Sequence, residues 1–236
     1  MEESVSRADA RATRILDAAG DLFAHYGYDK TTMDDIARAA LVSKGAIYLH
    51  YRGKEDLFDA LMARENDVLQ EIIMARLEAD GDRLTVFSLY RHAIEAALAR
   101  PLIRAIMTNN RRVLGDFMER LKKAPQYEET MGFRGEFVRQ LQQAGMIRDD
   151  VDADAMAAVL IAVRFGYLSL PDLIETAPPP EETGALIAEM LQRAFGTEFG
   201  DSEAGRAVMR ELFERGREFL NAMREQRMAG QRAVRP

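Results

Sequence analysis

The sequence predicts an all-α protein with a small N-terminal domain and a larger helical bundle behind it. Three observations lead to this prediction. Apolar residues recur three or four positions apart in most segments, which is the spacing of one helix face. No segment alternates between apolar and polar residues as a half-buried strand does. Glycine, proline and helix-capping residues interrupt the chain at intervals of ordinary helix length.

The first three helices are short enough to form one small unit. A helix is expected from about Ala8 to Tyr26, and Gly27 is well placed to end it. Thr32 is the expected N-cap of the second helix, with Asp35 three residues later in the position of a capping box. Ser43 is the expected N-cap of the third helix.

Longer helices follow Gly53, which interrupts the chain. The first of them should reach about Glu78. Further helices are expected over Leu84–Arg100, from Pro101, over Arg111–Lys123 and Glu128–Ala144, from Asp152 or Asp154 to Leu170, and over Glu181–Phe195 and Glu203–Arg227. These assignments divide the chain into residues 1–54, residues 55–200 and a C-terminal helix with a basic tail at 201–236.

Composition limits the classes of protein that are possible. The chain has 236 residues, of which 47% are hydrophobic, and this is enough for a sizeable core. It has no cysteine, which excludes disulfides, thiolate zinc sites and a cysteine nucleophile. The polar start has no signal peptide, and no apolar run approaches the roughly 20 residues that span a bilayer. A cytoplasmic protein without membrane contact is therefore expected.

The second and third helices have the order and length of a helix-turn-helix. The third helix, Ser43–Tyr51, carries Lys, Tyr and His. A helix of this length, about two turns, fits the major groove of B-DNA. The formal net charge of −7 argues mildly against nucleic-acid binding, because phosphate contacts need cations. Residues 43–54, however, contain several basic side chains and no acidic one. The pattern predicts a sequence-specific DNA-binding protein.

The stretches Thr31–Ala37, Val42–Tyr48 and Tyr51–Leu57 fall in register as cap, recognition helix and following helix. With these stretches, residues 10 to 58 resemble the DNA-binding domain of the tetracycline-repressor (TetR) family. It implies a homodimeric, ligand-responsive regulator, usually a repressor, with ligand binding and dimerisation in residues 55–200. Leu41 stands where the family usually has Gly, and a left-handed backbone there costs about 1–2 kcal/mol. Gly53 stands where a Ser-like cap is common.

Seven residues are candidate DNA contacts. They are Thr32, Ser43, Lys44, Ala46, Tyr48, His50 and Lys54. Lys44 can reach a phosphate or a guanine edge, and Ala46 can pack on a thymine methyl group or serve only close helix packing. Thr32 can help the amides of its helix start to hold a phosphate, although its capping role alone explains it.

A second group of residues is a candidate lining for an apolar effector cavity in the bundle. The group consists of Phe87, Tyr90, Phe117, Phe133, Phe137, Arg164 and Phe165. Aromatic residues at helical spacing more often form plain core. Arg164 lies inside an apolar run, where a cation needs an acidic partner or an anionic ligand. A dimer-interface ion pair is favoured over a ligand anchor.

The expected function is a repressor that leaves a palindromic double-stranded DNA operator when a small, largely apolar effector binds the bundle. The expected partners are the operator, the effector and a second copy of the chain. No cofactor, metal site or catalytic residue is assigned. The helices near 154–170 and 181–195 should pair with their copies. The alternatives are an activator or ligand-independent repressor of the same fold, an α-helical enzyme, and a structural DNA-bending protein, which should be more basic overall.

Overall fold

A computed structural model of the chain describes residues 2–81, 84–124, 127, 134–176, 178–197 and 200–233. Across these ranges the regular elements are helices, and one isolated bridge joins Ile147 to Gly196. The predicted all-α fold is confirmed. Phe133, one of the candidate cavity residues, lies outside the described residues.

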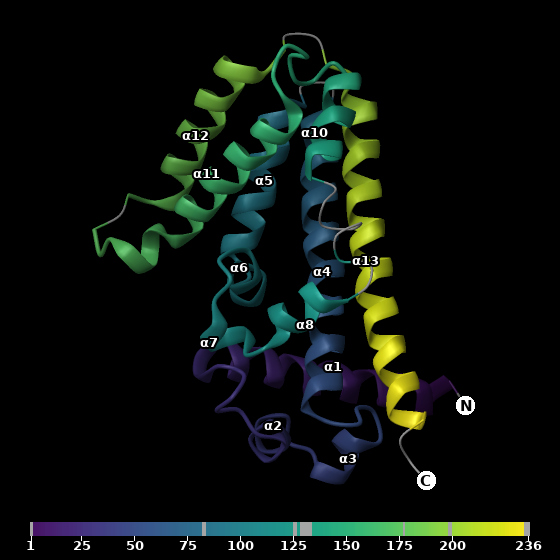
Figure 1. The fold of residues 1–236 in the computed structure, drawn as a ribbon. Coiled ribbons are helices and arrows are strands. Elements are labelled where there is room, and N and C mark those ends of the chain that lie inside the picture. Colours follow the sequence, from purple (N-terminus) through teal and green to yellow (C-terminus); the bar gives the residue numbers. More distant parts are fainter. Residues whose placement is uncertain are drawn as a thin grey trace.

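The N-terminal helices form the foot of the molecule (Figure 1). They are α1 (Glu2–Tyr26), α2 (Met33–Ala39) and α3 (Lys44–Tyr48). The long helix α4 (Lys54–Asp80) begins in this foot and rises through the bundle. The expected division at residues 54 and 55 therefore falls at the start of one continuous helix, which belongs to both parts of the molecule.

The remaining helices build the bundle with α4. They are α5 (Val86–Leu98), α6 (Pro101–Met107), α7 (Arg111–Leu114), α8 (Phe117–Lys123), α10 (Arg134–Gln143), α11 (Ala153–Leu173), α12 (Pro180–Phe195) and α13 (Ser202–Ala233). Helix α5 contacts α4 and α12, and α10 contacts α11 and α13. The last helix, α13, packs along α4 from the top of the bundle down to the foot.

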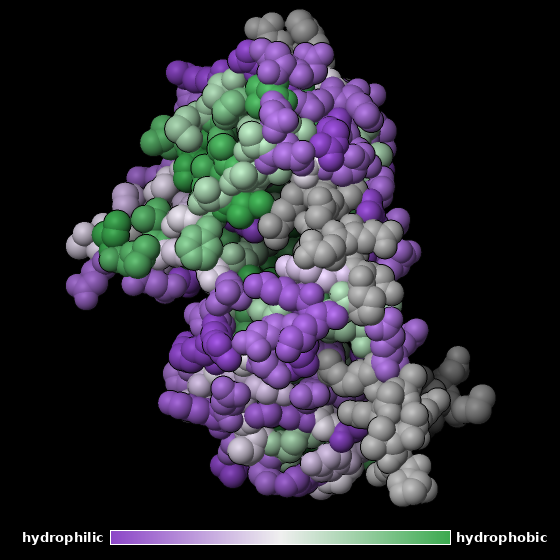
Figure 2. All heavy atoms as spheres, viewed as in Figure 1, coloured by the Kyte–Doolittle hydropathy of each residue, from purple (hydrophilic) through white to green (hydrophobic). Residues whose placement is uncertain are grey.

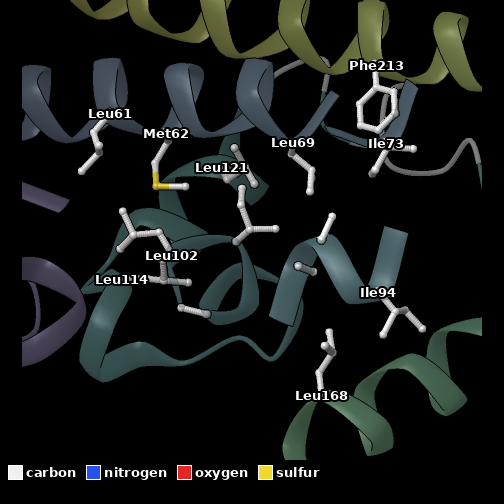
Figure 3. Close-up of a cluster of buried hydrophobic side chains, with 14 of the residues drawn as sticks. Leu61, Met62, Leu69, Ile73, Ile94, Leu102, Leu114, Leu121, Leu168 and Phe213 are labelled. Carbon is white, nitrogen blue, oxygen red and sulfur yellow. The ribbon is translucent and has the colours of Figure 1, made fainter. Parts of the chain in front are cut away.

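The core gathers around α4. Leu61, Met62 and Leu69 of α4 lie against a cluster that includes Leu102 and Leu121, from α6 and α8 (Figure 3). These side chains are at most 5% exposed. Full burial of one such side chain contributes about 1.5–3 kcal/mol. Helix α13 covers another side of α4, so α4 is buried on more than one face. This burial agrees with the apolar residues of α4, which are not confined to one face.

The prediction of a single helix over Arg111–Lys123 was wrong. The chain breaks at Gly115, whose φ of 57° lies in the left-handed region, so α7 and α8 are separate helices. A Cβ atom at Gly115 would lie 2.7 Å from the Tyr28 ring. Glycine is thus required at position 115 because Tyr28, which is far away in the sequence, approaches it closely. The local apolar periodicity does not predict this contact.

Helix α11 also differs from expectation. It continues through Pro171 to Leu173, three residues past its expected end. By length and composition alone, its 21 residues are long and apolar enough to cross a membrane, so the expectation that no segment reaches such a length was wrong. Only 28% of this apolar stretch is buried within the chain. The structure therefore leaves a long apolar face of α11 without an internal partner.

The turn before α3 holds a strained residue, as the sequence predicts. Leu41 has a φ of 55° and is 88% exposed, so its left-handed backbone is not offset by side-chain packing. Asparagine tolerates this conformation better than leucine does. We therefore expect Leu41→Asn to raise the free energy of unfolding by about 1 kcal/mol, measured by urea denaturation. The matched control is Leu49→Asn, because Leu49 is 81% exposed but has a right-handed backbone. An equal gain in both variants would contradict the strain at Leu41.

Four aromatic rings join the foot to the bundle. Phe23 of α1, Tyr28 of the following loop and Phe58 of α4 pack on one another, with ring centroids 5.0–5.5 Å apart. Phe117 of α8 adds an edge contact to Phe58 at 5.3 Å. Because these rings come from both parts of the molecule, the position of α4 in the foot depends on the position of α8 in the bundle.

This junction predicts a loss of stability at alkaline pH. Burial raises the pKa of Tyr28 to about 12, against a smaller opposing effect of Arg120. A raised pKa gives stability that is complete below the ordinary value near 10 and is lost as pH rises towards 12. At about 1.4 kcal/mol per pKa unit, the free energy of unfolding should fall by up to about 2–3 kcal/mol. Tyr28→Phe should remove much of that fall, whereas Tyr26→Phe, at a half-exposed ring, should not. Identical pH curves for Tyr28→Phe and the unaltered protein would contradict this cause.

Candidate nucleic-acid interface

Helix α2 begins with the capping box that the sequence predicts. The backbone N–H of Asp35 donates to Thr32 Oγ1 at 3.2 Å, and the backbone N–H of Thr32 donates to Asp35 Oδ2 at 3.1 Å. The hydrogen bonds from the Thr32 hydroxyl and amide hold the pKa of Asp35 below its ordinary value. Thr32 is exposed, but its hydroxyl also donates to Asp35 at 2.6 Å. The structure thus gives Thr32 a complete capping role.

A small core fixes the angle between α2 and α3. Ile36 of α2 and Ile47 of α3 are fully buried, and Ala40 and Tyr51 are nearly so. The backbone N–H of Val42 donates to the carbonyl of Ala37 at 3.0 Å and closes the turn between the two helices. This packing leaves the opposite side of α3 exposed to solvent.

Helix α3 is shorter than the two turns expected from the sequence. Its α-helical residues are Lys44–Tyr48, and Ser43 is its N-cap, with Oγ accepting the Ala46 N–H at 3.1 Å. Helical hydrogen bonding continues beyond it, because the N–H groups of Leu49 and Tyr51 donate to carbonyls four residues earlier. The hydrogen-bonded segment therefore still reaches Tyr51.

The outer face of α3 carries most of the candidate DNA contacts. Ser43, Lys44 and Tyr48 are exposed, while Ala46 and His50 are partly exposed. Leu49, which was not among the candidates, is 81% exposed beside them. Its size and hydrophobicity, within the helix predicted to enter the major groove, were a signal in the sequence, since an apolar side chain can contact a thymine methyl group.

Lys44 is paired with an acid of α2 in the protein alone. Its ammonium nitrogen lies 2.8 Å from Asp34 Oδ2, and this hydrogen bond raises the pKa of Lys44. Both side chains are about half exposed. Exposed ion pairs contribute little to stability, because water screens the two charges. A DNA phosphate can therefore replace Asp34 as the partner of Lys44 at small cost.

Lys54 has a different environment from the other candidates. It is partly buried, and its ammonium group donates to the backbone carbonyls of Tyr28 and Thr31 at 2.9 and 3.1 Å. It also lies 4.3 Å from the centroid of the Tyr28 ring. Lys54 therefore ties the start of α4 to the loop after α1, and the structure does not place it on the exposed face of α3.

The candidate cavity residues do not share one environment. Phe87 is buried in α5, and Phe117 packs at the junction with the foot. Phe165 is 49% exposed on the outer face of α11. Phe137 is partly buried in α10. These side chains cannot all line a single cavity.

Tyr90 and Arg164 do lie near each other, between α5 and α11. The hydroxyl of Tyr90 donates to the carbonyl of Leu160 at 2.6 Å. Burial raises the pKa of Tyr90, and the positive charge of Arg164 partly opposes this effect. Arg164 is partly buried at this place, whereas Ala162 and Phe165 beside it are exposed. Arg164 thus lies on the inner side of α11. Among the described residues no cluster of His, Asp and Glu is arranged to hold a metal ion.

Two N-capped short helices pack on a small core at one end of a helical bundle, and the second of these helices, α3, is exposed on its outer face. This arrangement defines a helix-turn-helix DNA-binding regulator. A family model described as "Bacterial regulatory proteins, tetR family" matches residues 15–61, the segment that builds this interface. The chain belongs to the TetR family of transcriptional regulators. Its members are DNA-binding proteins, so the alternative of an α-helical enzyme is set aside.

Two relatives match beyond the DNA-binding segment. The HTH-type transcriptional repressor Rv1474c of Mycobacterium tuberculosis is 29% identical over 160 residues, covering 68% of this chain and 81% of the relative. The probable acrEF/envCD operon repressor of Escherichia coli is 29% identical over 171 residues, covering 66% and 74%. Both relatives are named as repressors.

Solved structures agree with the fold. The fatty acid degradation regulator FadR of Bacillus halodurans superposes with a TM-score of 0.59 at 17% identity, over 77% of this chain and 94% of that one. SmeT in its complex with triclosan superposes with a TM-score of 0.58 at 21% identity, over 80% and 93%. At these identities the likeness shows the shared fold.

Proposed function

We propose that the chain is a homodimeric repressor that binds an inverted-repeat operator through α3 and leaves it when a small effector binds the bundle. The observation that carries this proposal is the exposed face of α3, on which Lys44 and Tyr48 are held outward by the buried Ile47. A second copy is needed because one short helix contacts only a few base pairs, and two half-sites give the required affinity. The expected place of action is the cytoplasm.

The surface of the bundle supports this dimer. Figure 2 shows hydrophobic side chains gathered over α11 and α12. The exposed apolar residues of these helices include Ala155, Ala158, Val159, Ala162, Phe165, Leu173, Ala185, Leu186 and Met190. A contiguous apolar patch of this kind on a soluble protein marks an interaction surface. A second copy of the chain, related by a two-fold axis, would cover it and match the symmetry of an inverted repeat.

A membrane is a poorer partner for the same face. Arg164 lies near the middle of α11, where it would reach the centre of a bilayer. A charged side chain at that depth costs at least about 2.5–3.5 kcal/mol. Pairing between copies keeps Arg164 on the inner side of α11, beside Tyr90.

The effector site is proposed between α5, α10 and α11. Tyr90 supplies partly buried aromatic surface between α5 and α11, and Arg164 supplies a positive charge beside it. Phe137 of α10, the helix that packs on α11, is a further partly buried aromatic candidate. Phe117 is assigned instead to the junction with the foot, and Phe165 to the dimer face. Related folds accept apolar molecules, since SmeT has been solved with triclosan. An apolar effector, with an acidic group facing Arg164, fits this lining.

The route from this site to the DNA runs through α4. Arg100, at the start of α6, makes two hydrogen bonds of 2.7 Å to the buried carboxylate of Glu65 in α4. Arg104 of α6 donates to the carbonyl of Leu168 in α11 at 2.9 Å. A ligand that moves α11 therefore acts on α6, and α6 acts on α4. A tilt of α4 changes the separation of the two α3 helices, which must match one turn of DNA, about 34–36 Å.

The test begins with the DNA. The unaltered protein should select an inverted-repeat duplex from a random-sequence library, and its affinity should fall steeply as salt rises. Thermal-shift screening of fatty acids, aromatic acids and neutral drugs then supplies effectors. A genuine effector must weaken operator binding by the same factor by which operator weakens effector binding. Binders that leave operator affinity unchanged would identify a ligand-independent repressor or activator.

A further inference from the structure

The C-terminal helix reaches the DNA-binding foot. Helix α13 runs antiparallel to α4, and its far end lies beside the foot in Figure 1. At the upper end Arg206 donates to the carbonyl of Gly81, just after α4, at 3.1 Å. Phe213, Phe219 and Met223 are each at most 8% exposed along its length. The helix is therefore anchored by burial and has a fixed position at its lower end.

At that lower end α13 meets a buried acid. The Nε of Arg224 donates to Asp56 Oδ1 at 3.0 Å. The other oxygen, Oδ2, accepts the backbone N–H of Arg52 at 2.9 Å. Asp56 is only 7% exposed. One carboxylate thus joins the last helix of the chain to the turn that follows the recognition helix.

The turn depends on this carboxylate because its own cap is missing. Gly53 is the N-cap of α4, and it makes no side-chain hydrogen bond. Asp56, in the first turn of α4, reaches back past Gly53 to Arg52 instead. A carboxylate buried to this degree requires a cation to offset its lost hydration, and Arg224 supplies one. Burial raises the pKa of Tyr51, and the positive charge of Arg224 lies close enough to oppose part of this rise.

We propose that Arg224 is a positioning residue for DNA recognition: by pairing with Asp56, the end of α13 fixes the turn that joins the recognition helix to α4. The inference rests on the proposed operator binding and assigns part of it to a helix outside the family-matched segment. Arg224 acts through Asp56 and touches no DNA phosphate. The orientation of α3 relative to α4 is then set by a contact between residues 168 positions apart.

The test compares three variants with the full-length protein: Arg224→Gln, Arg224→Lys and, as the matched control, Arg217→Ala at an exposed arginine of the same helix. The probe is the inverted-repeat duplex selected by the unaltered protein. Affinity is measured well below the unfolding temperature, after circular dichroism and light scattering have shown folded dimers. Binding by the unaltered protein in the same titration reports on the proposed function separately.

We expect Arg224→Gln to weaken operator binding roughly tenfold, Arg224→Lys to recover part of this loss, and Arg217→Ala to have no effect. The slope of log affinity against log salt should stay unchanged in Arg224→Gln, because no phosphate contact is lost. The double variant Arg224→Gln with Asp56→Asn should bind no more weakly than the worse single variant, since both remove one interaction.

Two results would overturn the proposal. Unchanged affinity in folded Arg224→Gln would make the pair a stabilising contact only. A salt slope that becomes shallower by about 0.9 for each Arg224 removed would mean that this arginine contacts phosphate directly. If the unaltered protein itself selects no duplex, the proposed function fails first, and the two failures are thereby distinguished.

Discussion

Replacing Lys44 and Tyr48 together by alanine should reduce operator affinity by about 100-fold or more, with folding and dimer mass unchanged. Both side chains lie on the exposed face of α3, and their removal takes nothing from the small core. A good contact to DNA contributes about 1–3 kcal/mol of discrimination, and a dimer loses each contact twice. The measurement is a fluorescence anisotropy titration with the selected duplex.

Salt dependence separates the two contributions to this loss. If Lys44 exchanges Asp34 for a phosphate in each half-site, Lys44→Ala alone should make the salt slope shallower by about 1.8. Tyr48→Ala should lower affinity without that change. The control is Lys122→Ala, which removes an exposed lysine from α8 in the bundle and should leave both quantities unchanged. Full affinity in the folded double variant would show that α3 is not the recognition helix.

The parts of this interface that the sequence could predict are those with local causes. Thr32 and Ser43 cap their helices through hydrogen bonds to residues three positions away, so the sequence pattern contains the whole interaction. The left-handed turn at Leu41 was implied by the resemblance to the TetR family, in which glycine usually stands at this position.

The parts that the sequence could not predict depend on distant partners. Lys54 was expected to bind phosphate, and two of its three ammonium hydrogens are donated to carbonyls of the loop after α1. Gly115 divides a predicted helix because Tyr28 approaches it closely. The importance of Asp56 appears only when Arg224 is brought beside it. None of these contacts leaves a periodic or motif-like trace, because each joins segments that the fold alone brings together.

Helix α11 shows the same limit at the level of assembly. Its apolar composition predicted burial, yet much of its apolar face is exposed in the single chain. The small residues Ala158, Ala162 and Gly166 are exposed along this face, and a Cβ atom at Gly166 would meet no atom within 4 Å. Small residues at helical spacing allow close packing against another helix. The burial that the sequence predicts is therefore expected between copies of the chain.

Placing one acidic residue in this face should abolish the dimer. We expect Ala162→Glu and, separately, Phe165→Glu to raise the dimer dissociation constant by 100-fold or more. Each variant would bury two unpaired carboxylates, one from each copy, across the two-fold axis, and each buried carboxylate costs several kcal/mol. Sedimentation velocity should then show monomers at micromolar concentration. Operator affinity should fall as well, because a monomer engages one half-site and loses the effective concentration of the second. The matched control is Ala75→Glu, the same substitution at an exposed alanine of α4, which should remain dimeric and bind operator normally. If Ala162→Glu and Ala75→Glu were equally dimeric, the α11 face would not be the interface, and the inverted-repeat geometry would need a different two-fold axis.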